Sequence, residues 1–414
     1  MPRADFRPDF PAETISEGEV KVVVPNLKAY GKLPSDYAPS KAPVFYNPVM
    51  ELNRDFAVLA LQACRKLVNR DLRVCEPLTA SGLRGIRFAA EVEGIEEVLI
   101  GDLNERAFKL AQHNIALNKL TCKVKVKNME ANCLLSSHSA PHTRFDCIDI
   151  DPFGSPIHFL DSAVRALRNG GMLAVTATDM APLCGVHPRA CIRKYGGKPL
   201  RTEYCHELAV RLVAGSLATT AAKHDIGLNV VFAHQSEHYA RVYVTIAYGA
   251  KHADESLKNM GYVLHCFKCF HRETIKGLYP LPINEKCSEC GSKLNLGGPM
   301  WVGRLFDAGF CRLMKDNVHK RSLKVSKRIR KLLDLAEGEA EAPVSYFVID
   351  KLCESMSLPV PSMKDVNQAA EREGFEACLT IFSTRGIKSN MPASKMKEIV
   401  SMLASGAYSR RIGE

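Results

Sequence analysis

Short apolar runs alternate with longer amphipathic segments between Leu72 and Gly249. Apolar runs bounded by turn residues are typical of buried strands, and the segments between them have the length of helices. The pattern predicts a doubly wound α/β sheet of seven strands. We expect these strands at Arg73–Glu76, Val98–Gly101, Cys122–Val126, Phe145–Ile150, Met172–Ala177, Leu228–Ala233 and Val242–Tyr248.

The last two runs, Leu228–Ala233 and Val242–Tyr248, are separated by too few residues for a crossover helix. They are therefore predicted to form an antiparallel pair at the edge of the sheet. A mainly parallel sheet that ends in such a pair is typical of Rossmann-like methyltransferases.

The sheet is flanked by segments of different character. Residues 1–55 are predicted to be an N-terminal extension or lid, with a strand at Val20–Val24 and a Pro-, Tyr- and Ser-rich stretch before a helix that begins near Met50. Residues 56–250 would form the domain that contains the sheet.

After Gly249 the alternation stops, and residues 251–414 are predicted to form a second, smaller α+β domain. This part contains a Cys- and Pro-rich segment, a basic stretch, an acidic linker at Glu337–Glu341 and a strand at Thr380–Phe382.

Composition narrows the class of protein. Of 414 residues, 46% are hydrophobic and 24% charged, and no apolar run approaches the length of a membrane span. The first twenty residues lack the pattern of a signal or transit peptide, and the fifteen cysteines show no disulfide framework. We expect a cytoplasmic monomer without a membrane partner.

The turn after the first strand, from Glu76 to Arg87, carries Gly82 and Gly85. Glycine permits a close backbone approach to a ligand at the N-terminus of a helix. The dinucleotide fingerprint G-x-G-x-x-G is absent, which argues against a pyrophosphate cradle and for a smaller cofactor such as S-adenosylmethionine (AdoMet).

Four further positions are candidate AdoMet ligands. Asp102 ends the second strand, where a carboxylate can accept both ribose hydroxyl hydrogens. Glu130 and Ala131 follow the third strand, where this fold contacts an adenine ring. Arg54 and Arg84 are both candidates to hold the methionine carboxylate, although either can instead pair with a core acid.

The fourth strand ends in Asp149-Ile-Asp151-Pro152-Phe153-Gly154. The amino nitrogen of guanine is a poor nucleophile because its lone pair is delocalised into the ring. Two acceptors for its hydrogens, the Asp151 carboxylate and the Pro152 carbonyl, would direct that pair at a methyl group while Phe153 stacks on the base. Phe45 is a candidate to cover the other face of the base, and Asp149 is expected to be structural.

A series of motifs runs in register along the chain from residue 45 to residue 207. They are Phe45-Tyr-Asn-Pro, Asn53-Arg54-Asp55, Gly82-x-Arg84-Gly-Ile-Arg87, Asp149-x-Asp151-Pro-Phe-Gly-Ser-Pro156, Thr176-Ala-Thr-Asp179-x-Ala-Pro-Leu-Cys-Gly185, His187-Pro-Arg-Ala-Cys191 and Arg201-x-Glu203-x-Cys205-His206-Glu207. On these motifs the chain resembles the tRNA guanine-26 N2-dimethyltransferase family. The resemblance implies AdoMet contacts at Arg54, Arg84, Asp102 and the Glu130-Ala131 pair, with Asp151 catalytic and tRNA as the substrate. The chain departs from the family at Cys75-Glu76-Pro77, where Asp-Ala is expected, and at Met129-Glu130, where paired aspartates are commoner.

Three cysteines in these motifs, Cys184, Cys191 and Cys205, raise the alternative of nucleophilic attack on a pyrimidine. Enzymes of that class place the nucleophile in a Pro-Cys pair, and the sequence contains none. We interpret the three as small buried side chains.

Two C-x-x-C pairs, Cys266/Cys269 and Cys287/Cys290, have the spacing of a four-thiolate zinc ribbon. Four cysteines with no missing ligand predict a closed structural zinc site. A redox pair or disulfides are the alternatives.

A basic stretch follows between Arg312 and Lys331, with nine Lys or Arg residues and one acid. If Arg312–Leu333 is one helix, a basic face would contact the tRNA backbone, and the alternative is a solvated surface. That face would comprise Lys320, Arg321, Lys324, Lys327, Arg328 and Lys331, opposite the apolar side chains of Val325, Ile329, Leu332 and Leu333.

The leading hypothesis is methyl transfer from AdoMet to the N2 amino group of guanine 26 in tRNA. An amino-methyltransferase acting on another base or on a protein side chain, and a zinc-ribbon RNA-binding protein without catalysis, are the alternatives.

Overall fold

The computed structural model describes residues 7–31, 39–236, 238–278 and 284–408. Its centre is a seven-stranded sheet in the order β5-β4-β3-β6-β7-β9-β8, in which β9 runs antiparallel to both β7 and β8. The predicted sheet and its antiparallel edge pair are confirmed. The strands are β3 (Leu72–Glu76), β4 (Ile95–Asp102), β5 (Val124–Asn128), β6 (Phe145–Ile150), β7 (Leu167–Ala177), β8 (Ile226–Ser236) and β9 (Tyr239–Tyr248).

The central strands are buried on both faces, as is usual in parallel sheets covered by helices. All six residues of β6 are buried, including Asp146 and Asp149. The accompanying helices are α1 (Glu51–Val68), α2 (Leu83–Glu91), α3 (Glu105–Leu117), α4 (Ala131–Ser136), α5 (Leu160–Arg165), α6 (Met180–Leu183), α7 (Pro188–Tyr195), α8 (Cys205–Ala222) and α9 (Ala250–Leu257).

The N-terminal extension contains a hairpin of β1 (Ala12–Glu17) and β2 (Val20–Pro25). The Asn114 side chain on α3 bonds the backbone N–H and C=O of Val23, at 2.7 and 2.9 Å, and so holds β2 against the sheet domain. The predicted strand is confirmed as β2. The pairing of β2 with β1 carries Glu17 into the protein interior, where its side chain is 2% exposed.

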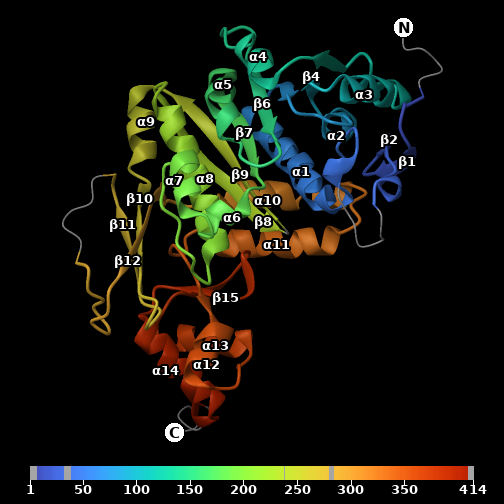
Figure 1. Cartoon of the computed structure of the whole chain (residues 1–414). Coiled ribbons are helices and arrows are strands. Elements are labelled where there is room, and N and C mark those ends of the chain that lie inside the picture. Colours follow the sequence, from blue (N-terminus) through green and yellow to red (C-terminus); the bar gives the residue numbers. More distant parts are fainter. Residues whose placement is uncertain (1–6, 32–38, 237, 279–283, 409–414) are drawn as a thin grey trace.

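The chain after Gly249 forms two structures (Figure 1). A three-stranded sheet, in the order β11-β10-β12, is followed by two helices beneath the sheet domain, and a terminal α+β lobe lies beyond them. The first part comprises β10 (Met260–His265), β11 (Arg272–Lys276), β12 (Asn295–Trp301), α10 (Ala308–Lys315) and α11 (Ser326–Gly338). The lobe comprises β13 (Phe347–Val348), α12 (Ile349–Met356), α13 (Met363–Arg372), β14 (Ala377–Thr380), β15 (Ser383–Ser389) and α14 (Ala393–Ala404).

The main hydrophobic core does not stop at residue 250. It extends from Val20 to Phe382 and includes Trp301 on β12, Met314 on α10 and Leu333 on α11. A separate core fills the terminal lobe. Many side chains of residues 260–340 therefore belong to the core of the sheet domain, whereas the lobe has a separate core, and a small apolar cluster surrounds Cys266 and Cys287.

A buried charge cluster joins the terminal lobe to α8. Lys388 on β15 lies 2.9 Å from Glu207 and 3.4 Å from Glu339, and Arg211 pairs with the same Glu207 carboxylate at 2.8 Å. Each of these side chains is at most 2% exposed. Because a buried charge is costly without its partner, the cluster favours one position of the lobe against α8.

The predicted single helix over Arg312–Leu333 is wrong. The chain forms α10, a short 3-10 helix η5 (Val318–Lys320) and a loop before α11 begins at Ser326. The break lets the loop bury Leu323 and turn Arg321 inward, whereas Val325, predicted on the apolar face, is 36% exposed.

The predicted strand at Thr380–Phe382 is displaced. Strand β14 ends at Thr380, and Ile381 and Phe382 form the connection to β15. The Glu339 carboxylate accepts bonds from the Thr380 hydroxyl and the Ile381 N–H, at 2.8 and 2.7 Å, and so holds the chain in this bend.

Among the described residues, no helix combines the length and apolar character needed to cross a bilayer.

Candidate active site

A cavity of about 870 Å³ opens at the carboxyl ends of β3, β4 and β6, where open α/β sheets hold their ligands. Its volume is within the range of small-molecule sites. The structure brings most of the predicted site residues to its wall, namely Phe45, Arg54, Arg84, Asp102, Asp151, Pro152 and Phe153.

The glycine turn between β3 and α2 forms one side of this cavity. Gly82 caps α2 with φ at 80°, a left-handed conformation that favours glycine. At Gly85 a Cβ atom would lie 2.4 Å from Ile100 Cγ2 and 2.9 Å from the Glu76 carboxylate. Only glycine lets α2 pack this closely on the sheet.

Arg84, on the first turn of α2, is the centre of a buried charge cluster. Its guanidinium contacts the carboxylate of Asp151, lies 3.5 Å from those of Glu76 and Asp149, and donates to the Asn53 side chain at 2.8 Å. Three acidic side chains thus surround this cation, and a second cation contacts the same cluster.

Arg241 on β9 supplies that second cation. It forms a bidentate pair with Asp149, with N–O distances of 2.5 and 3.1 Å, and donates to the Thr176 hydroxyl at 2.6 Å. The structural role predicted for Asp149 agrees with this contact. Sequence reasoning missed Arg241 because it lies within an apolar strand, at a position with no motif.

The same two cations keep Asp151 ionised. Burial alone would raise the pKa of Asp151, but the charges of Arg84 and Arg241 outweigh burial and lower the pKa below its usual value. At neutral pH the carboxylate is an acceptor at the cavity wall, with 18% of its side chain exposed.

The loop after Asp151 is held against the end of β7. Gly154, with φ at 73°, donates its N–H to the Thr178 hydroxyl at 2.7 Å, and its carbonyl accepts from the Thr178 N–H at 2.9 Å. These bonds hold Pro152 buried and leave Phe153 67% exposed at the cavity mouth.

Phe45 and Phe153 meet across the cavity. Their ring centroids are 4.4 Å apart and the rings are nearly perpendicular, with an angle of 86°. The two rings predicted to enclose a base therefore lie together, but they contact each other edge to face. A base stacked between them requires the rings to separate.

Asp102, at the end of β4, has unused acceptor capacity. Its carboxylate accepts from the backbone N–H groups of Ala80 and Asn104, at 2.8 and 2.9 Å. A carboxylate has about four lone-pair sites, so it can also accept two hydroxyl hydrogens from a ribose. The residues present therefore fit the ribose of AdoMet.

Arg54 lines the cavity but is held by a partner that sequence reasoning missed. Its guanidinium makes two bonds of 2.6 Å to Glu17 and one of 3.2 Å to the Asn47 carbonyl. Arg87 lies 2.9 Å from the same carboxylate. Burial would raise the pKa of Glu17, yet Arg54 and Arg87 lower it, so the pair is ionic.

Of the predicted cofactor ligands, Glu130 and Ala131 are not among the residues that line the cavity. Glu130 caps α4 and accepts from the Cys133 N–H at 2.9 Å. The adenine contact expected of this pair remains a prediction.

The four cysteines of the C-x-x-C pairs come together at one end of β10. Their sulfur atoms lie within 4.8 Å of one another, and the Cys266–Cys290 and Cys269–Cys287 distances are both 3.5 Å. Four thiolates around a tetrahedral zinc ion lie about 3.8 Å apart, given a Zn–S bond of about 2.3 Å. The donor set fits zinc.

The basic residues predicted to contact tRNA separate into two groups. Arg321 and Lys324 have protein partners, since Arg321 donates to the Gln62 side chain at 2.8 Å and to the Glu91 carbonyl, and Lys324 lies 3.2 Å from Glu51. Lys320, Lys327 and Lys331 are exposed and have no carboxylate partner among the described residues. Arg328 is also exposed and contacts the Ser236 hydroxyl at 3.4 Å.

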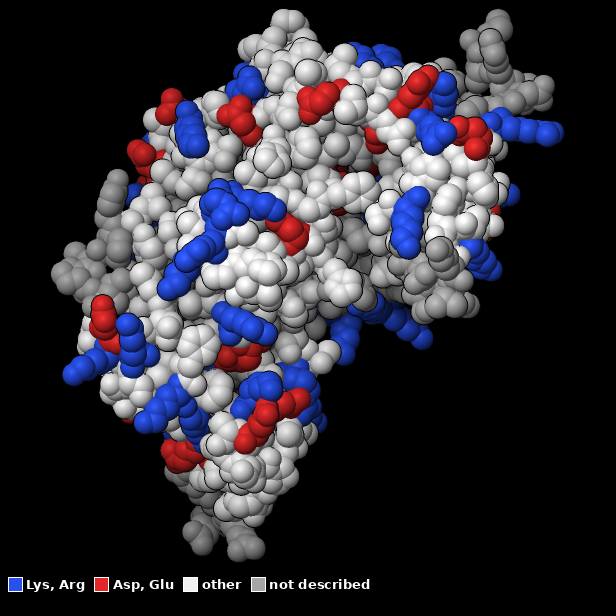
Figure 2. Space-filling view, viewed as in Figure 1, with Lys and Arg blue, Asp and Glu red and all other residues white. Residues whose placement is uncertain are grey.

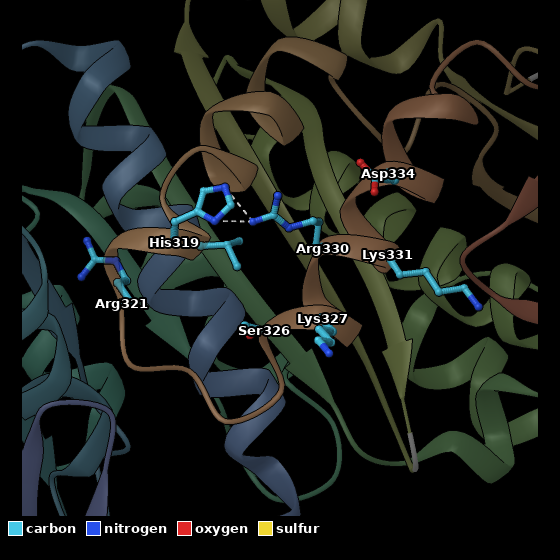
Figure 3. A pocket seen from close by; sticks show the side chains of 8 residues that line it. His319, Arg321, Ser326, Lys327, Arg330, Lys331 and Asp334 are labelled. Atoms are coloured by element: carbon cyan, nitrogen blue, oxygen red, sulfur yellow. Dashed lines mark hydrogen bonds between the residues drawn. The ribbon is translucent and has the colours of Figure 1, made fainter.

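A surface cavity of about 480 Å³ lies between η5 and the first turns of α11. Figure 3 shows the Arg330 guanidinium turned toward His319, with Lys327 and Lys331 pointing outward and Arg321 pointing away from them. In Figure 2, Lys and Arg side chains project along the lower edge of the sheet domain, where α11 lies in Figure 1.

The reversed strand β9 between β7 and β8, and a strand-end acid beside a glycine turn, are features of Rossmann-like methyltransferases. An ionised Asp-Pro-Phe loop at the same edge suits an amino group as the methyl acceptor. The chain thus falls in the class of Rossmann-like amino-methyltransferases.

Comparison with known proteins identifies the family. Residues 18–401 match the model of the N2,N2-dimethylguanosine tRNA methyltransferase family, and the chain belongs to this family. A tRNA (guanine(26)-N(2))-dimethyltransferase of Methanobrevibacter smithii is 40% identical over 96% of this chain and 99% of its own.

Two further relatives extend the comparison. The tRNA (guanine(26)-N(2)/guanine(27)-N(2))-dimethyltransferase of Aquifex aeolicus is 36% identical over 84% of this chain and 86% of its own. The solved complex of Trm1 from Pyrococcus horikoshii with S-adenosyl-L-methionine aligns with a TM-score of 0.81 and 34% identity, over 94% of this chain and 99% of that one.

The buried acid Glu76 predicts a pH dependence of stability. Burial raises its pKa to about 8, assisted by Asp149 and opposed by Arg84, from an ordinary value of 4.5. Between these values the unfolded chain loses the proton and the folded protein keeps it, so this group makes stability fall as pH rises from about 5 to about 8. The expected slope is about 1.4 kcal/mol per pH unit.

Denaturant titrations of the wild type and of Glu76→Gln across this pH range measure the slope. The variant should lack the part of the pH dependence that comes from Glu76. The free energy of unfolding of the variant should therefore rise relative to that of the wild type as pH increases. Parallel curves for the two proteins would show that Glu76 is ionised in the folded state.

Proposed function

We propose that this protein transfers methyl groups from AdoMet to the N2 amino group of guanine 26 in tRNA. The observation that carries the proposal is the ionised Asp151 carboxylate, in an Asp-Pro-Phe loop, on the wall of the same cavity as Asp102. Membership of the family indicates tRNA as the substrate. The name of the Methanobrevibacter smithii relative specifies N2 of guanine 26 as the methylated atom.

The bound cofactor supplies an electrophilic methyl group. Asp102 would hold its ribose with the two acceptor positions that Ala80 and Asn104 leave free. Arg84 and Arg54 lie on the same wall, but both are already paired with acids. A methionine carboxylate would therefore share Arg84 with Asp151, and Arg54 would act mainly by holding the wall in place.

The protein orients the base through its amino group. Asp151 accepts one amino hydrogen and the Pro152 carbonyl accepts the other, so that the nitrogen lone pair points at the methyl carbon. Phe153 stacks on one face of the base and Phe45 covers the other, once their edge-to-face contact has opened. The lowered pKa keeps Asp151 ionised as a hydrogen-bond acceptor, and the proton that the amino nitrogen loses can pass through this carboxylate to solvent.

Position 26 must be read outside the pocket, because a pocket that recognises guanine cannot recognise its place in a tRNA. Phosphate contacts fix the register of a folded RNA. We assign this role to the exposed basic residues around η5 and α11, namely Lys320, Lys327, Arg328 and Lys331, with Arg321 and Lys324 as neighbours that shape the loop. Guanine 27 is the second candidate target, since the Aquifex aeolicus relative is named for both positions.

We further propose that Cys266, Cys269, Cys287 and Cys290 hold one structural zinc ion. The donor set leaves no position for a substrate, so the ion would stabilise the β10–β12 sheet without a role in the chemistry.

Asp151→Asn should lower the methylation rate at least about 100-fold, because it removes the charged acceptor. AdoMet affinity should stay within about tenfold. Asp161→Asn, at an aspartate with a 58% exposed side chain, is the matched control. Single-turnover transfer of labelled methyl to tRNA, followed by nucleoside analysis, measures both the rate and the product. Wild-type turnover by Asp151→Asn would overturn the mechanism, and label on another atom would overturn the proposed function.

Replacing Lys320, Lys327 and Lys331 together by Glu should weaken tRNA binding strongly. The slope of log affinity against log salt should fall by about 2 to 3, because each lost phosphate contact removes about 0.9. The matched control changes Lys119, Lys123 and Lys127, also exposed, to Glu. AdoMet affinity should remain unchanged in both triple variants. Equal tRNA affinities for the two variants across a salt series would place the tRNA elsewhere.

Cys266→Ser should lower the zinc content by about one ion per chain. The melting temperature of the β10–β12 region should fall, because the metal closes its end, and metal analysis with thermal unfolding measures both effects. Cys122→Ser, at an exposed cysteine, is the control and should change neither. Unchanged zinc content in Cys266→Ser would refute the assignment.

A further inference from the structure

Three metal-ligating side chains that the methyl-transfer site does not use meet between the end of α6 and the start of α8. They are Cys184, Cys205 and His206, and their ligand atoms lie within 4.8 Å of one another. None of the three residues lines the cavity beside Asp151.

We propose that Cys184, Cys205 and His206 form a second metal site, for zinc or another thiophilic divalent ion. In tetrahedral zinc sites the Zn–S bond is about 2.3 Å and the Zn–N bond about 2.0 Å, so neighbouring donors lie about 3.5 to 3.8 Å apart. Small side-chain rotations bring donors that are already within 4.8 Å to this spacing. Three protein ligands leave the fourth position to water.

The backbone holds the two sulfur atoms together without a metal. Cys184 is the C-cap of α6, and the next residue, Gly185, has φ at 86°. A Cβ atom on Gly185 would lie 2.9 Å from the Arg201 backbone N, so the end of α6 is pressed against the segment that leads into α8. The site is therefore preformed by the fold.

The position of Cys205 favours a thiolate, the form that binds metals. It is the first residue of α8, an 18-residue helix whose N-cap is Tyr204. The dipole at a helix N-terminus stabilises a negative sulfur.

Two features distinguish this site from ordinary buried cysteines: its side chains are at least partly exposed to solvent, and it offers three metal-ligating atoms. Cys184 and Cys205 are partly exposed and His206 is exposed, whereas the nearby Cys191 is fully buried. The sequence-based interpretation of all three cysteines as buried is thus correct for Cys191 alone. A simple thiol pair would not need an imidazole, and His206 is the third donor that a metal ion requires.

The proposed ion would brace one wall of the active site. Helix α6 follows Thr178, which lines the cavity and holds the Gly154 backbone. A metal that joins the end of α6 to α8 would limit the movement of this segment. The site is separate from the four-cysteine cluster, and its occupancy does not depend on methyl transfer.

Metal counting on the full chain tests the proposal. Protein reconstituted with zinc under reducing conditions and freed of excess metal should contain about two ions per chain, and the Cys184→Ser/Cys205→Ser double variant about one. Cys266→Ser/Cys269→Ser should also retain about one, at the proposed second site. Cys122→Ser is the matched control and should retain the wild-type count.

A second variant covers the case in which the double variant fails to fold. Because His206 is exposed, His206→Gln should stay folded. It should lower the affinity of the second site for zinc at least about tenfold, as measured by competition with a chelator. In cobalt titrations of the Cys266→Ser/Cys269→Ser variant, thiolate-to-cobalt charge-transfer absorption should persist and should disappear when Cys184→Ser is added. Wild-type protein that saturates at about one ion per chain, with that ion unaffected by Cys184→Ser and His206→Gln, would overturn the proposal.

Discussion

The active site depends on one shared cation. Arg84 is buried among the carboxylates of Glu76, Asp149 and Asp151, and the sheet can hold these acids at one edge only because Arg241 supplies a second positive charge. Burial without these cations would raise the pKa of Asp151 and leave it as a donor in place of an acceptor. The electrostatics of the cluster therefore decide what the Asp-Pro-Phe loop can do, and Gly85 is required because it lets α2 bring Arg84 close enough.

The rest of the molecule supports this edge. The N-terminal hairpin carries Glu17 to Arg54 and Arg87, so the extension is joined to the wall of the cavity through buried ion pairs. Helices α10 and α11 continue the main hydrophobic core, which means that the surface proposed to bind tRNA is built on the same rigid body as the catalytic loop. A rigid connection of this kind lets phosphate contacts set where a base enters the pocket.

Local patterns predicted the sheet, its antiparallel edge, and the residues Arg84, Asp102, Asp151 and Phe153, because strand ends and turns have short-range signals. Contacts between distant segments had no such signal: Glu17 reaches Arg54 only after β1 pairs with β2, and Arg241 lies in an apolar strand. Helical periodicity also extended the basic helix too far. Periodicity carries no information on tertiary contacts, and here the burial of Leu323 and the inward turn of Arg321 interrupt the helix before Ser326.

The pH dependence of single-turnover methyl transfer tests the central claim most directly. If Arg84 and Arg241 keep Asp151 ionised as a hydrogen-bond acceptor, the rate constant should stay level from about pH 8 down to about pH 5, since the pKa of Asp151 lies below its ordinary value. The Glu76→Gln variant, measured in parallel, removes the neighbouring acid, whose pKa is raised to about 8. A rate that falls in both proteins with an apparent pKa between about 6 and 7 would contradict the account, because Asp151 would then have to gain a proton in that range.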